Sequence, residues 1–468
     1  MDISEYKKIA NNHPDSKYLW ITSSERNRID LQKFLTILKD NCHLETINLW
    51  HIEINFCEVM KLCEFIEINT SLRELYLIFT NIGNIGVKHI TETLISNKNV
   101  KSLDLCKNGI DNIGAKYLSD LIYKNHTITT YNVRNNNISF IGTKLLVDAL
   151  INNNIAKIFN IKNNMMSEIS MYYIAKLISS NTNLENINIS GNYVGDIGLR
   201  VISEAIKNNT NLKILVMEFC GITYLGVQFL SDAIKINNTL ERIILSGNQI
   251  GNIGIKSLSQ SLIINTNITI LSLCECGLSD NDIYDLSQCL KMNTILVELL
   301  LKKNNFTHIG IEYLSNALKK NIGLQTIFLP GNNIDHIGME YLADALKINT
   351  TLKTLYISDN NIGDVGMKYL SESLLYNNTL KELYISKNNI TSMGAKLLAE
   401  SLRLNMTLKK LDIICNNICE LGNNALLDML NINLGLEDML GIKDGDKLVT
   451  PEYREIKRRC SMIKATKN

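Results

Sequence analysis

The sequence is poor in proline and carries no excess of charge of either sign. Only 3 prolines occur among its 468 residues, and no stretch rich in proline, glycine and serine marks a linker between domains. Lys and Arg together number 48 and Asp and Glu 47, so the formal net charge is +1. A balance of this kind gives no electrostatic field that would attract a phosphate backbone or an anionic membrane. We therefore expect neither a nucleic acid nor a membrane among the partners.

Hydrophobic segments for targeting or membrane insertion are also missing. The amino-terminal residues MDISEYKKIANNHPDSKYLW lack the apolar region of a signal peptide. No run approaches the roughly 18 apolar residues that a membrane-spanning helix needs. The 11 cysteines lack the spacing of a disulfide framework, which is typical of reduced thiols and of a cytoplasmic protein. A nuclear location is the alternative, because Lys457-Arg458-Arg459 form a short basic run.

No motif typical of an enzyme or a metal site occurs in the sequence. There is no GxxxxGK[ST] loop for nucleotide phosphates, no HExxH motif and no pair of CxxC motifs. The densest group of thiols is Cys274, Cys276 and Cys289, which we interpret as structural rather than metal-binding. We therefore expect no catalytic residue, no bound metal and no cofactor.

The sequence consists instead of a repeat. Residues 352–379 read LKTLYISDNNIGDVGMKYLSESLLYNNT, and residues 380–407 read LKELYISKNNITSMGAKLLAESLRLNMT. Leucine, isoleucine, asparagine and glycine recur in the two segments at a fixed step of 28 residues. A fixed period in this range indicates stacked supersecondary units instead of separate globular domains.

Each unit is predicted to contain one short strand and one helix. Leu355 and Ile357 alternate with polar residues, as in a strand that buries one face. Gly366 is expected where the helix comes close to the strand layer, and Leu370 and Leu374 follow at helical spacing. Asn377 is expected to end the helix, because asparagine tolerates the left-handed conformation of a C-cap. Triplets such as Asn237-Asn238-Thr239 fall in this helix-end column, so we interpret them as capping residues and not as glycosylation sites.

The pattern LxxLxLxxNxIxxxGxxxLxxxLxxN resembles the leucine-rich repeat of the ribonuclease-inhibitor-like type. The resemblance implies an α/β solenoid, or horseshoe, with a parallel sheet on its concave face and helices on its convex face. It also implies a protein ligand held against the concave face. Ribonuclease inhibitors, innate immune receptors and activators of the nuclear-transport GTPase share this scaffold, so the resemblance does not select one function.

We expect three regions along the chain. Residues 1–43 form a polar lead-in and a degenerate capping repeat, residues 44–435 form fourteen repeats, and residues 436–468 form a degenerate final repeat with a basic cap. The regular units begin at Leu44, Leu72, Val100, Ile128, Ile155, Leu184, Leu212, Leu240, Ile268, Leu296, Leu324, Leu352, Leu380 and Leu408. With these starts, the unit at Ile128 has lost one residue and the next unit has gained one.

One asparagine per unit is expected to form a ladder that satisfies backbone groups in the turn after each strand. Its members are Asn108, Asn136, Asn163, Asn192, Asn248, Asn304, Asn332, Asn360, Asn388 and Asn416. Ile52, Thr80, Cys220 and Cys276 occupy this column in the other units. The glycine column is replaced by Glu58, Ser170 and Asp282, and we expect slightly displaced helices there.

Two aromatic groups on the concave face are the candidate binding sites. Phe328, Tyr356 and Tyr384 fall in one column and are expected to form a ladder on adjacent strands. A second apolar patch near the amino-terminal end consists of Trp50, His51, Tyr76, Ile78 and Phe79. Phe159 is assigned to the same column as Tyr76. Aromatic residues often anchor protein interfaces, although they also suit a plain sheet surface. The charged residues of this face, among them Glu382 and Lys302, are of mixed sign.

The sequence therefore predicts a monomeric, non-catalytic scaffold that binds a protein partner on its concave surface. The identity of the partner does not follow from the sequence. One alternative is an activator or other regulator of a small GTPase. Another is the substrate-recognition subunit of a ubiquitin ligase, although no adaptor motif is visible in residues 1–43.

Overall fold

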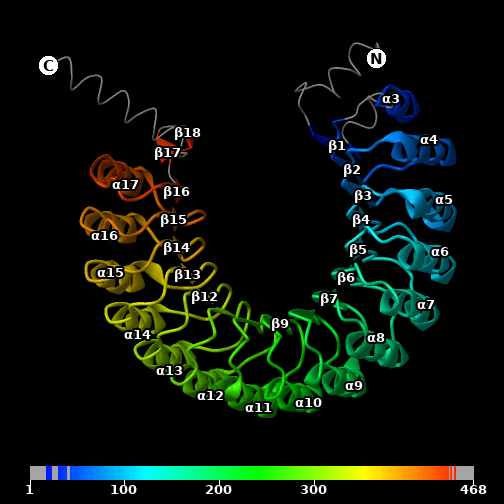
Figure 1. The fold of residues 1–468 in the computed structure, drawn as a ribbon. Coiled ribbons are helices and arrows are strands. Elements are labelled where there is room, and N and C mark those ends of the chain that lie inside the picture. Colours follow the sequence, from blue (N-terminus) through cyan, green and yellow to red (C-terminus); the bar gives the residue numbers. More distant parts are fainter. Residues whose placement is uncertain (1–16, 24–29, 39–42, 442, 445–446, 449–468) are drawn as a thin grey trace. The chain divides into compact units, whose positions relative to one another are not determined.

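The computed structural model describes residues 17–23, 30–38, 43–441, 443–444 and 447–448. The basic run Lys457-Arg458-Arg459 and most of the expected carboxy-terminal cap lie outside the described residues. The chain divides into two compact units, Met1–Leu240 and Glu241–Asn468, which we describe one at a time. Strands alternate with helices in both units (Figure 1).

Among its described residues, the first unit contains eight parallel strands that pair in the order in which they occur along the chain. The strands are β1 (Tyr18–Thr22), β2 (Thr46–Trp50), β3 (Glu74–Ile78), β4 (Ser102–Asp104), β5 (Thr130–Asn132), β6 (Ile158–Asn160), β7 (Asn186–Asn188) and β8 (Ile214–Val216). The helices are α3 (Leu31–Leu38), α4 (Phe56–Ile68), α5 (Gly83–Ser96), α6 (Asn112–Lys124), α7 (Phe140–Ile151), α8 (Glu168–Ser180), α9 (Gly195–Lys207) and α10 (Tyr224–Ile234).

The second unit repeats this arrangement. Its parallel strands are β9 (Arg242–Ile244), β10 (Ile270–Ser272), β11 (Glu298–Leu300), β12 (Thr326–Phe328), β13 (Thr354–Tyr356), β14 (Glu382–Tyr384), β15 (Lys410–Asp412) and β16 (Asp438–Leu440), followed by the antiparallel pair β17 (Lys443–Asp444) and β18 (Lys447–Leu448). The helices are α11 (Gly251–Ile264), α12 (Asp280–Leu290), α13 (His308–Leu318), α14 (His336–Leu346), α15 (Gly363–Leu374), α16 (Ser392–Leu402) and α17 (Glu420–Ile432).

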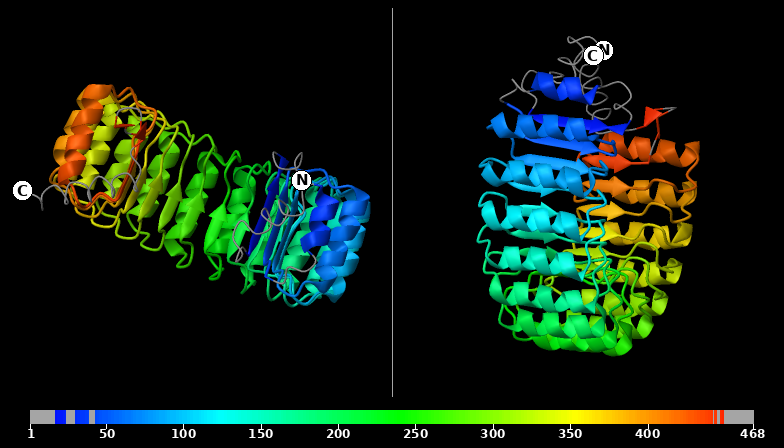
Figure 2. Two further views of the ribbon diagram at one scale, coloured as in Figure 1. Left: turned by 90° about the horizontal axis from the view of Figure 1, so that it is seen from above. Right: turned by 90° about the vertical axis from the view of Figure 1, so that its right-hand side faces the viewer.

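In each unit the core lies between the strands and a single layer of helices. Leu355 and Ile357 from the strand side and Leu370 and Leu374 from α15 are at most 1% exposed. The helices of each unit cover one face of its sheet and leave the other face open, and they lie side by side in chain order (Figures 1 and 2). This is the α/β arrangement that the strand and helix columns of the sequence predict.

The strand register corrects one of the expected repeat boundaries. Thr130 pairs with Ile158 and Ile158 pairs with Asn186, so the register advances by 28 residues at both steps and no residue is deleted or inserted. The repeat that we assigned to begin at Ile155 begins at Ala156 instead. The sequence prediction was wrong here because Ile155 is the larger apolar residue and Ala156 fills the same buried position with a smaller side chain.

The shift by one residue also corrects two assignments within that repeat. Phe159 is 0% exposed and lies in the core, so it does not belong to the open-face column that contains Tyr76. Asn160 occupies that column and pairs with Asn132. Asn164, and not Asn163, occupies the turn ladder, since its Nδ2 donates to the carbonyls of Val133 and Ile161. Asn163 is exposed and donates to the Asn135 side chain.

Each ladder asparagine connects its repeat to the preceding one. Nδ2 of Asn136 donates to the Leu105 carbonyl at 3.0 Å, and its Oδ1 accepts from the backbone N–H groups of Asn108 at 2.9 Å and Ile110 at 3.0 Å. The bond to the carbonyl 31 residues earlier recurs in Asn108, Asn164, Asn192, Asn304, Asn332, Asn360, Asn388 and Asn416. The thiols of Cys220 and Cys276 donate to the equivalent carbonyls. The ladder therefore satisfies turn groups that the sheet leaves unpaired.

A second asparagine ladder lies at the helix ends and was not recognised as a ladder in the sequence. Asn125 is typical: its Nδ2 donates to the Leu94 carbonyl at 2.8 Å, and its Oδ1 accepts from the backbone N–H groups of Thr127 and Ile128. Its φ of −89° and ψ of 127° are extended, so the expected left-handed C-cap is wrong for this residue. Asparagine occupies this column in every repeat from Asn69 to Asn433, which was the available signal.

The glycine column is explained by contacts between adjacent repeats. The N–H of Gly114 donates to Oδ1 of Asn84 in the preceding repeat at 3.0 Å, and a Cβ on Gly114 would lie 2.5 Å from that oxygen. Where glycine is replaced, the new side chain caps its own helix. Asp282 accepts from the Ser279 N–H at 2.7 Å, and Glu58 and Ser170 form capping boxes at the same helix position.

Candidate protein-binding surfaces

The aromatic ladder of the second unit is formed by three adjacent strands. Phe328, Tyr356 and Tyr384 end β12, β13 and β14, and the strand register pairs them directly. The ring centroids of Phe328 and Tyr356 are 4.7 Å apart with a tilt of 54°. Those of Tyr356 and Tyr384 are 4.1 Å apart and nearly parallel, with an angle of 10°. All three side chains are half-buried, so the rings form a continuous row on the open sheet face.

Glu382 holds one end of this aromatic ladder in place. The hydroxyl of Tyr384 donates to Oε2 of Glu382 at 2.9 Å, and Lys410 Nζ lies 3.3 Å from Oε1 of the same carboxylate. Burial of the ring, followed by the bond to Glu382, raises the pKa of Tyr384. The phenol therefore stays protonated at neutral pH and remains a hydrogen-bond donor. Lys302, the other charged residue predicted for this site, lies two residues beyond β11 and flanks the ladder on the side of Phe328.

The predicted patch in the first unit is centred on Phe79. One face of its ring stacks on His51, with centroids 4.5 Å apart and an angle of 11°. Lys107 Nζ lies 3.8 Å from the centroid of the same ring, which is the geometry of a cation–π contact. Trp50 lies beside this stack, with its ring centroid 6.0 Å from that of His51. The structure thus brings Trp50 and Phe79 into one cluster through His51.

Tyr76 lies on the same face but outside this cluster. It is in the centre of β3, and the register pairs it with Asn48 on β2 and Asp104 on β4. Burial raises the pKa of its hydroxyl. Among the residues that the structure describes, no ring contact joins Tyr76 to Trp50 or Phe79. Trp50 pairs with Ile78, so Tyr76, Trp50 and Phe79 lie in three different columns of the repeat.

One residue per repeat, just beyond the end of the strand, adopts a left-handed backbone. The column with positive φ comprises His51, Phe79, Lys107, Asn135, Asn163, Gly191, Phe219, Gly247, Glu275, Lys303, Gly331, Asp359, Lys387 and Cys415. This conformation is unusual for a bulky side chain such as Phe79 or Phe219. Strain of this kind is tolerated where the surrounding structure determines it, and it is frequent at binding sites. Phe219 is 57% exposed and was not recognised as a surface aromatic in the sequence.

Several other exposed apolar residues were also missed. Tyr18 and Trp20 of β1 are 69% and 65% exposed. Exposed apolar side chains also form rows across the repeats, one at the first turn of the helices and one just beyond their last turn. The row at the first turn is Ile85, Ile113, Ile141, Ile169, Ile197, Leu225, Ile253, Ile309, Ile337, Val365, Met393 and Leu421, and the row just beyond the last turn includes Ile348, Tyr376 and Leu404. These exposed residues recur in the sequence at the repeat period. The buried apolar residues recur at the same period, so the sequence does not distinguish the two sets.

The cysteines are suited to structural roles. Burial raises the pKa of Cys276 to about 11 and that of Cys289 to about 12, so both remain thiols at neutral pH. A thiol must lose its proton to bind a metal ion. Among the described residues, no group of three or more His, Cys, Asp or Glu side chains could hold a metal. Within the same residues, no helix has the length and hydrophobicity to cross a membrane.

Comparisons with known proteins find leucine-rich repeats in six segments of the chain. Residues 96–119, 180–203, 208–231, 237–259, 349–371 and 376–399 match the family model of the leucine-rich repeat. An internalin from Listeria monocytogenes has a similar structure over 93% of this chain and 98% of its own, with 17% sequence identity and a TM-score of 0.42. The actin-binding site 2 of leiomodin-1 is similar over 40% of this chain and 95% of its own, with 19% identity and a TM-score of 0.29. No curated protein matches the sequence.

Proposed function

We propose that this leucine-rich-repeat chain is a non-catalytic scaffold that binds a protein partner on its open sheet face, the concave surface expected from the sequence. The observation that supports this best is the aromatic ladder of Phe328, Tyr356 and Tyr384. The three half-buried rings pack against one another and form an apolar strip. Because the rings are already held in place, binding a partner costs little side-chain conformational entropy. Aromatic side chains of this kind are enriched among the residues that dominate binding energy.

The surroundings of the ladder suit a folded protein more than a small molecule. Glu382, Lys410 and Lys302 supply charges of both signs around the apolar strip, as at the rim of a protein interface. The cluster of Trp50, His51 and Phe79 in the first unit is a second candidate contact. A small GTPase and a component of a ubiquitin ligase are the two specific partner classes to test.

The proposal includes the finer features of the repeat. We assign the chain to the ribonuclease-inhibitor-like type, with fourteen repeats between residues 44 and 435 and degenerate repeats at 1–43 and 436–468. The register of 28 residues between successive strands supports this assignment. We place the protein in the cytoplasm as a monomer, and the ladder cysteines, which donate as thiols, agree with a reducing compartment.

A partner-capture experiment tests the proposal. The full chain is tagged and purified from a lysate, and bound proteins are identified by mass spectrometry beside a Phe328→Ala, Tyr356→Ala, Tyr384→Ala variant. A Tyr284→Ala, Tyr313→Ala variant is the matched control, because it removes an aromatic pair from helices α12 and α13. We expect a stoichiometric partner that the control retains and the ladder variant loses. Retention by the folded ladder variant would contradict the assignment of the site.

A further inference from the structure

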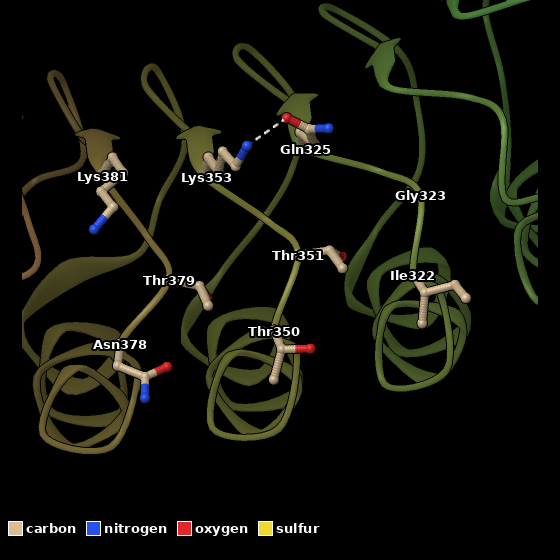
Figure 3. A pocket seen from close by; sticks show the side chains of 9 residues that line it. All are labelled: Ile322, Gly323, Gln325, Thr350, Thr351, Lys353, Asn378, Thr379 and Lys381. Atoms are coloured by element: carbon tan, nitrogen blue, oxygen red, sulfur yellow. Dashed lines mark hydrogen bonds between the residues drawn. The ribbon is translucent and has the colours of Figure 1, made fainter.

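A shallow groove crosses the edge of the second unit where the helices end and the chain returns to the strands. It has a volume of about 310 Å³ and extends over three consecutive repeats. One wall is formed by residues that precede the strands, and the other by residues that follow the helices (Figure 3). The first wall contains Gln325, Lys353 and Lys381, and the second contains Ile322, Thr350 and Asn378.

The charge of this groove has one sign. None of the 9 residues that line it is acidic. Lys353 Nζ donates to the neutral Gln325 side chain at 2.8 Å, and neither Lys353 nor Lys381 forms an ion pair within the described part of the chain. Lys409 continues the row on the next repeat, where it pairs with Glu437 at 3.1 Å. The strand-side wall therefore presents unneutralised positive charge on a chain whose total charge is nearly zero.

The helix-side wall continues into exposed apolar surface. Ile322 is 68% exposed. Ile348 and Tyr376, two residues before the lining residues Thr350 and Asn378, are 59% and 70% exposed, and Leu404 in the next repeat is 75% exposed. Ile348, Tyr376 and Leu404 each lie two residues beyond α14, α15 and α16, so they form a row at the repeat period, and Ile322 lies four residues beyond α13. They are more exposed than the half-buried rings of the aromatic ladder. Contiguous apolar surface beside a charged strip is typical of a site that binds an amphipathic segment.

We propose that this edge groove binds an acidic amphipathic helix of a protein partner. Adjacent strands are about 4.8 Å apart, so Lys353 and Lys381 are separated by a similar distance. Side chains at i and i+4 of a helix are separated by roughly 5–6 Å, which is close to this spacing. Adjacent helices are about 8–10 Å apart, close to the roughly 11 Å of two helical turns. A helix that lies across the repeats therefore directs carboxylates towards Lys353 and Lys381 while its apolar face contacts Tyr376 and Leu404.

The test measures binding of a designed peptide to the full chain by fluorescence anisotropy. The probe is a fluorescein-labelled synthetic helix with glutamate at every fourth position beside a row of leucines, and the control peptide has lysine in place of each glutamate. We expect the acidic probe to bind and the basic peptide to bind at least about tenfold more weakly. Equal binding of the two peptides, or no binding of the acidic probe, would overturn the proposal.

Matched variants locate the binding site of the probe. The double variant Lys353→Glu, Lys381→Glu should weaken binding of the probe at least about tenfold. The double variant Tyr376→Ala, Leu404→Ala should also weaken it. Lys101→Glu is the control, because Lys101 occupies the corresponding position in the first unit and is also exposed. Equal affinity of the Lys353→Glu, Lys381→Glu and Lys101→Glu variants would overturn the assignment. So would light scattering that shows a dimer lost in the Lys353→Glu, Lys381→Glu variant, since a second copy would then occupy the groove.

This inference is separate from the proposed function of the open face. The Phe328→Ala, Tyr356→Ala, Tyr384→Ala variant should bind the acidic probe with the affinity of the unaltered chain. Loss of probe binding in that variant would mean that the peptide lies on the aromatic ladder and not in the groove.

Discussion

At the scale of single residues, the molecule depends on side-chain amides that replace missing backbone partners. A turn asparagine accepts two N–H groups and donates to the preceding repeat, so each residue serves several backbone groups at once. The sequence predicted this ladder from the asparagine column alone. It could not distinguish Asn163 from Asn164, because two asparagines are adjacent there and only the hydrogen bonds separate them.

This distinction gives a prediction for the stability of the first unit. Asn164→Ala should lower the free energy of unfolding by about 1–3 kcal/mol, because it leaves partly buried backbone groups without partners. Asn163→Gly should change it by less than about 0.5 kcal/mol, since residue 163 is exposed and glycine suits its φ of 51°. Chemical denaturation followed by circular dichroism measures both. A larger loss in Asn163→Gly would restore the original assignment of the ladder.

Cysteine reactivity is a second property that single contacts determine. The Ser392 hydroxyl lies 2.8 Å from the Cys419 sulfur and lowers the pKa of that exposed thiol, so more of it is thiolate at neutral pH. Ser392→Ala should raise the pKa of Cys419 and slow its alkylation by iodoacetamide a few-fold at pH 7.5. Mass spectrometry of labelled peptides gives the rate.

Two other thiols are internal controls for that measurement. Cys415 is exposed and four residues away, and its rate should not change in Ser392→Ala. Burial raises the pKa of Cys220 to about 12, and this thiol should stay unlabelled until the chain unfolds. Identical alkylation of Cys419 in both proteins would show that Ser392 does not influence its pKa.

At the scale of elements, the strands and helices followed from the repeat pattern, and the departures have local causes. The boundary at Ala156 was missed because a small apolar residue fills a position usually held by leucine. The left-handed column was missed because it contains Phe79 and Lys107 as well as glycine, so composition does not reveal its φ values. The exposed apolar surfaces were predicted only in part, because period and residue type alone do not show which apolar columns are exposed.

The inner face of the helices contains buried hydroxyls that lead to a prediction. The Ser315 hydroxyl of α13 is buried and has no hydrogen-bond partner among the described residues. Ala343 and Ala399 occupy the same column in α14 and α16, so alanine fits there. Ser315→Ala should be neutral or raise the free energy of unfolding by up to about 1 kcal/mol, because an unpaired buried hydroxyl is removed.

A serine two columns further along the helix is the matched control. Ser373 of α15 is also buried, but its hydroxyl donates to the Leu370 carbonyl at 2.7 Å. Ser373→Ala should therefore lower the free energy of unfolding by about 1 kcal/mol. Thermal unfolding of both variants under identical conditions measures the difference. Equal losses in the two variants would show that the Ser315 hydroxyl has a partner after all.

At the scale of the whole molecule, the repeats make most of their contacts with their immediate neighbours. Strands pair in chain order within each unit, and a ladder asparagine such as Asn136 bonds within its own repeat and to the preceding one. The free energy of unfolding of such an array is close to the sum of the stabilities of the individual repeats and of the interfaces between adjacent repeats. Binding can therefore be altered on one surface without changing the repeats that are distant from it.

Hydrogen exchange tests this locality. In the Asn164→Ala variant, faster amide exchange should be confined to the repeats around β5 and β6, because the hydrogen bonds of the Asn164 side chain lie there. Peptides from β12 to β15 should exchange at the rate of the unaltered chain. Mass spectrometry of the exchanged peptides gives both results. Acceleration throughout the chain would indicate one global cooperative unit.

The affinity of the purified partner for the open face of the second unit tests the central claim most directly. Isothermal titration calorimetry compares three proteins. They are the unaltered chain, the triple ladder variant (Phe328→Ala, Tyr356→Ala, Tyr384→Ala) and the double helix control (Tyr284→Ala, Tyr313→Ala). The account predicts that the ladder variant binds at least about a hundredfold more weakly, as expected when several interface anchors are truncated, while its circular dichroism spectrum is unchanged. A ladder variant that binds with the affinity of the helix control would contradict it.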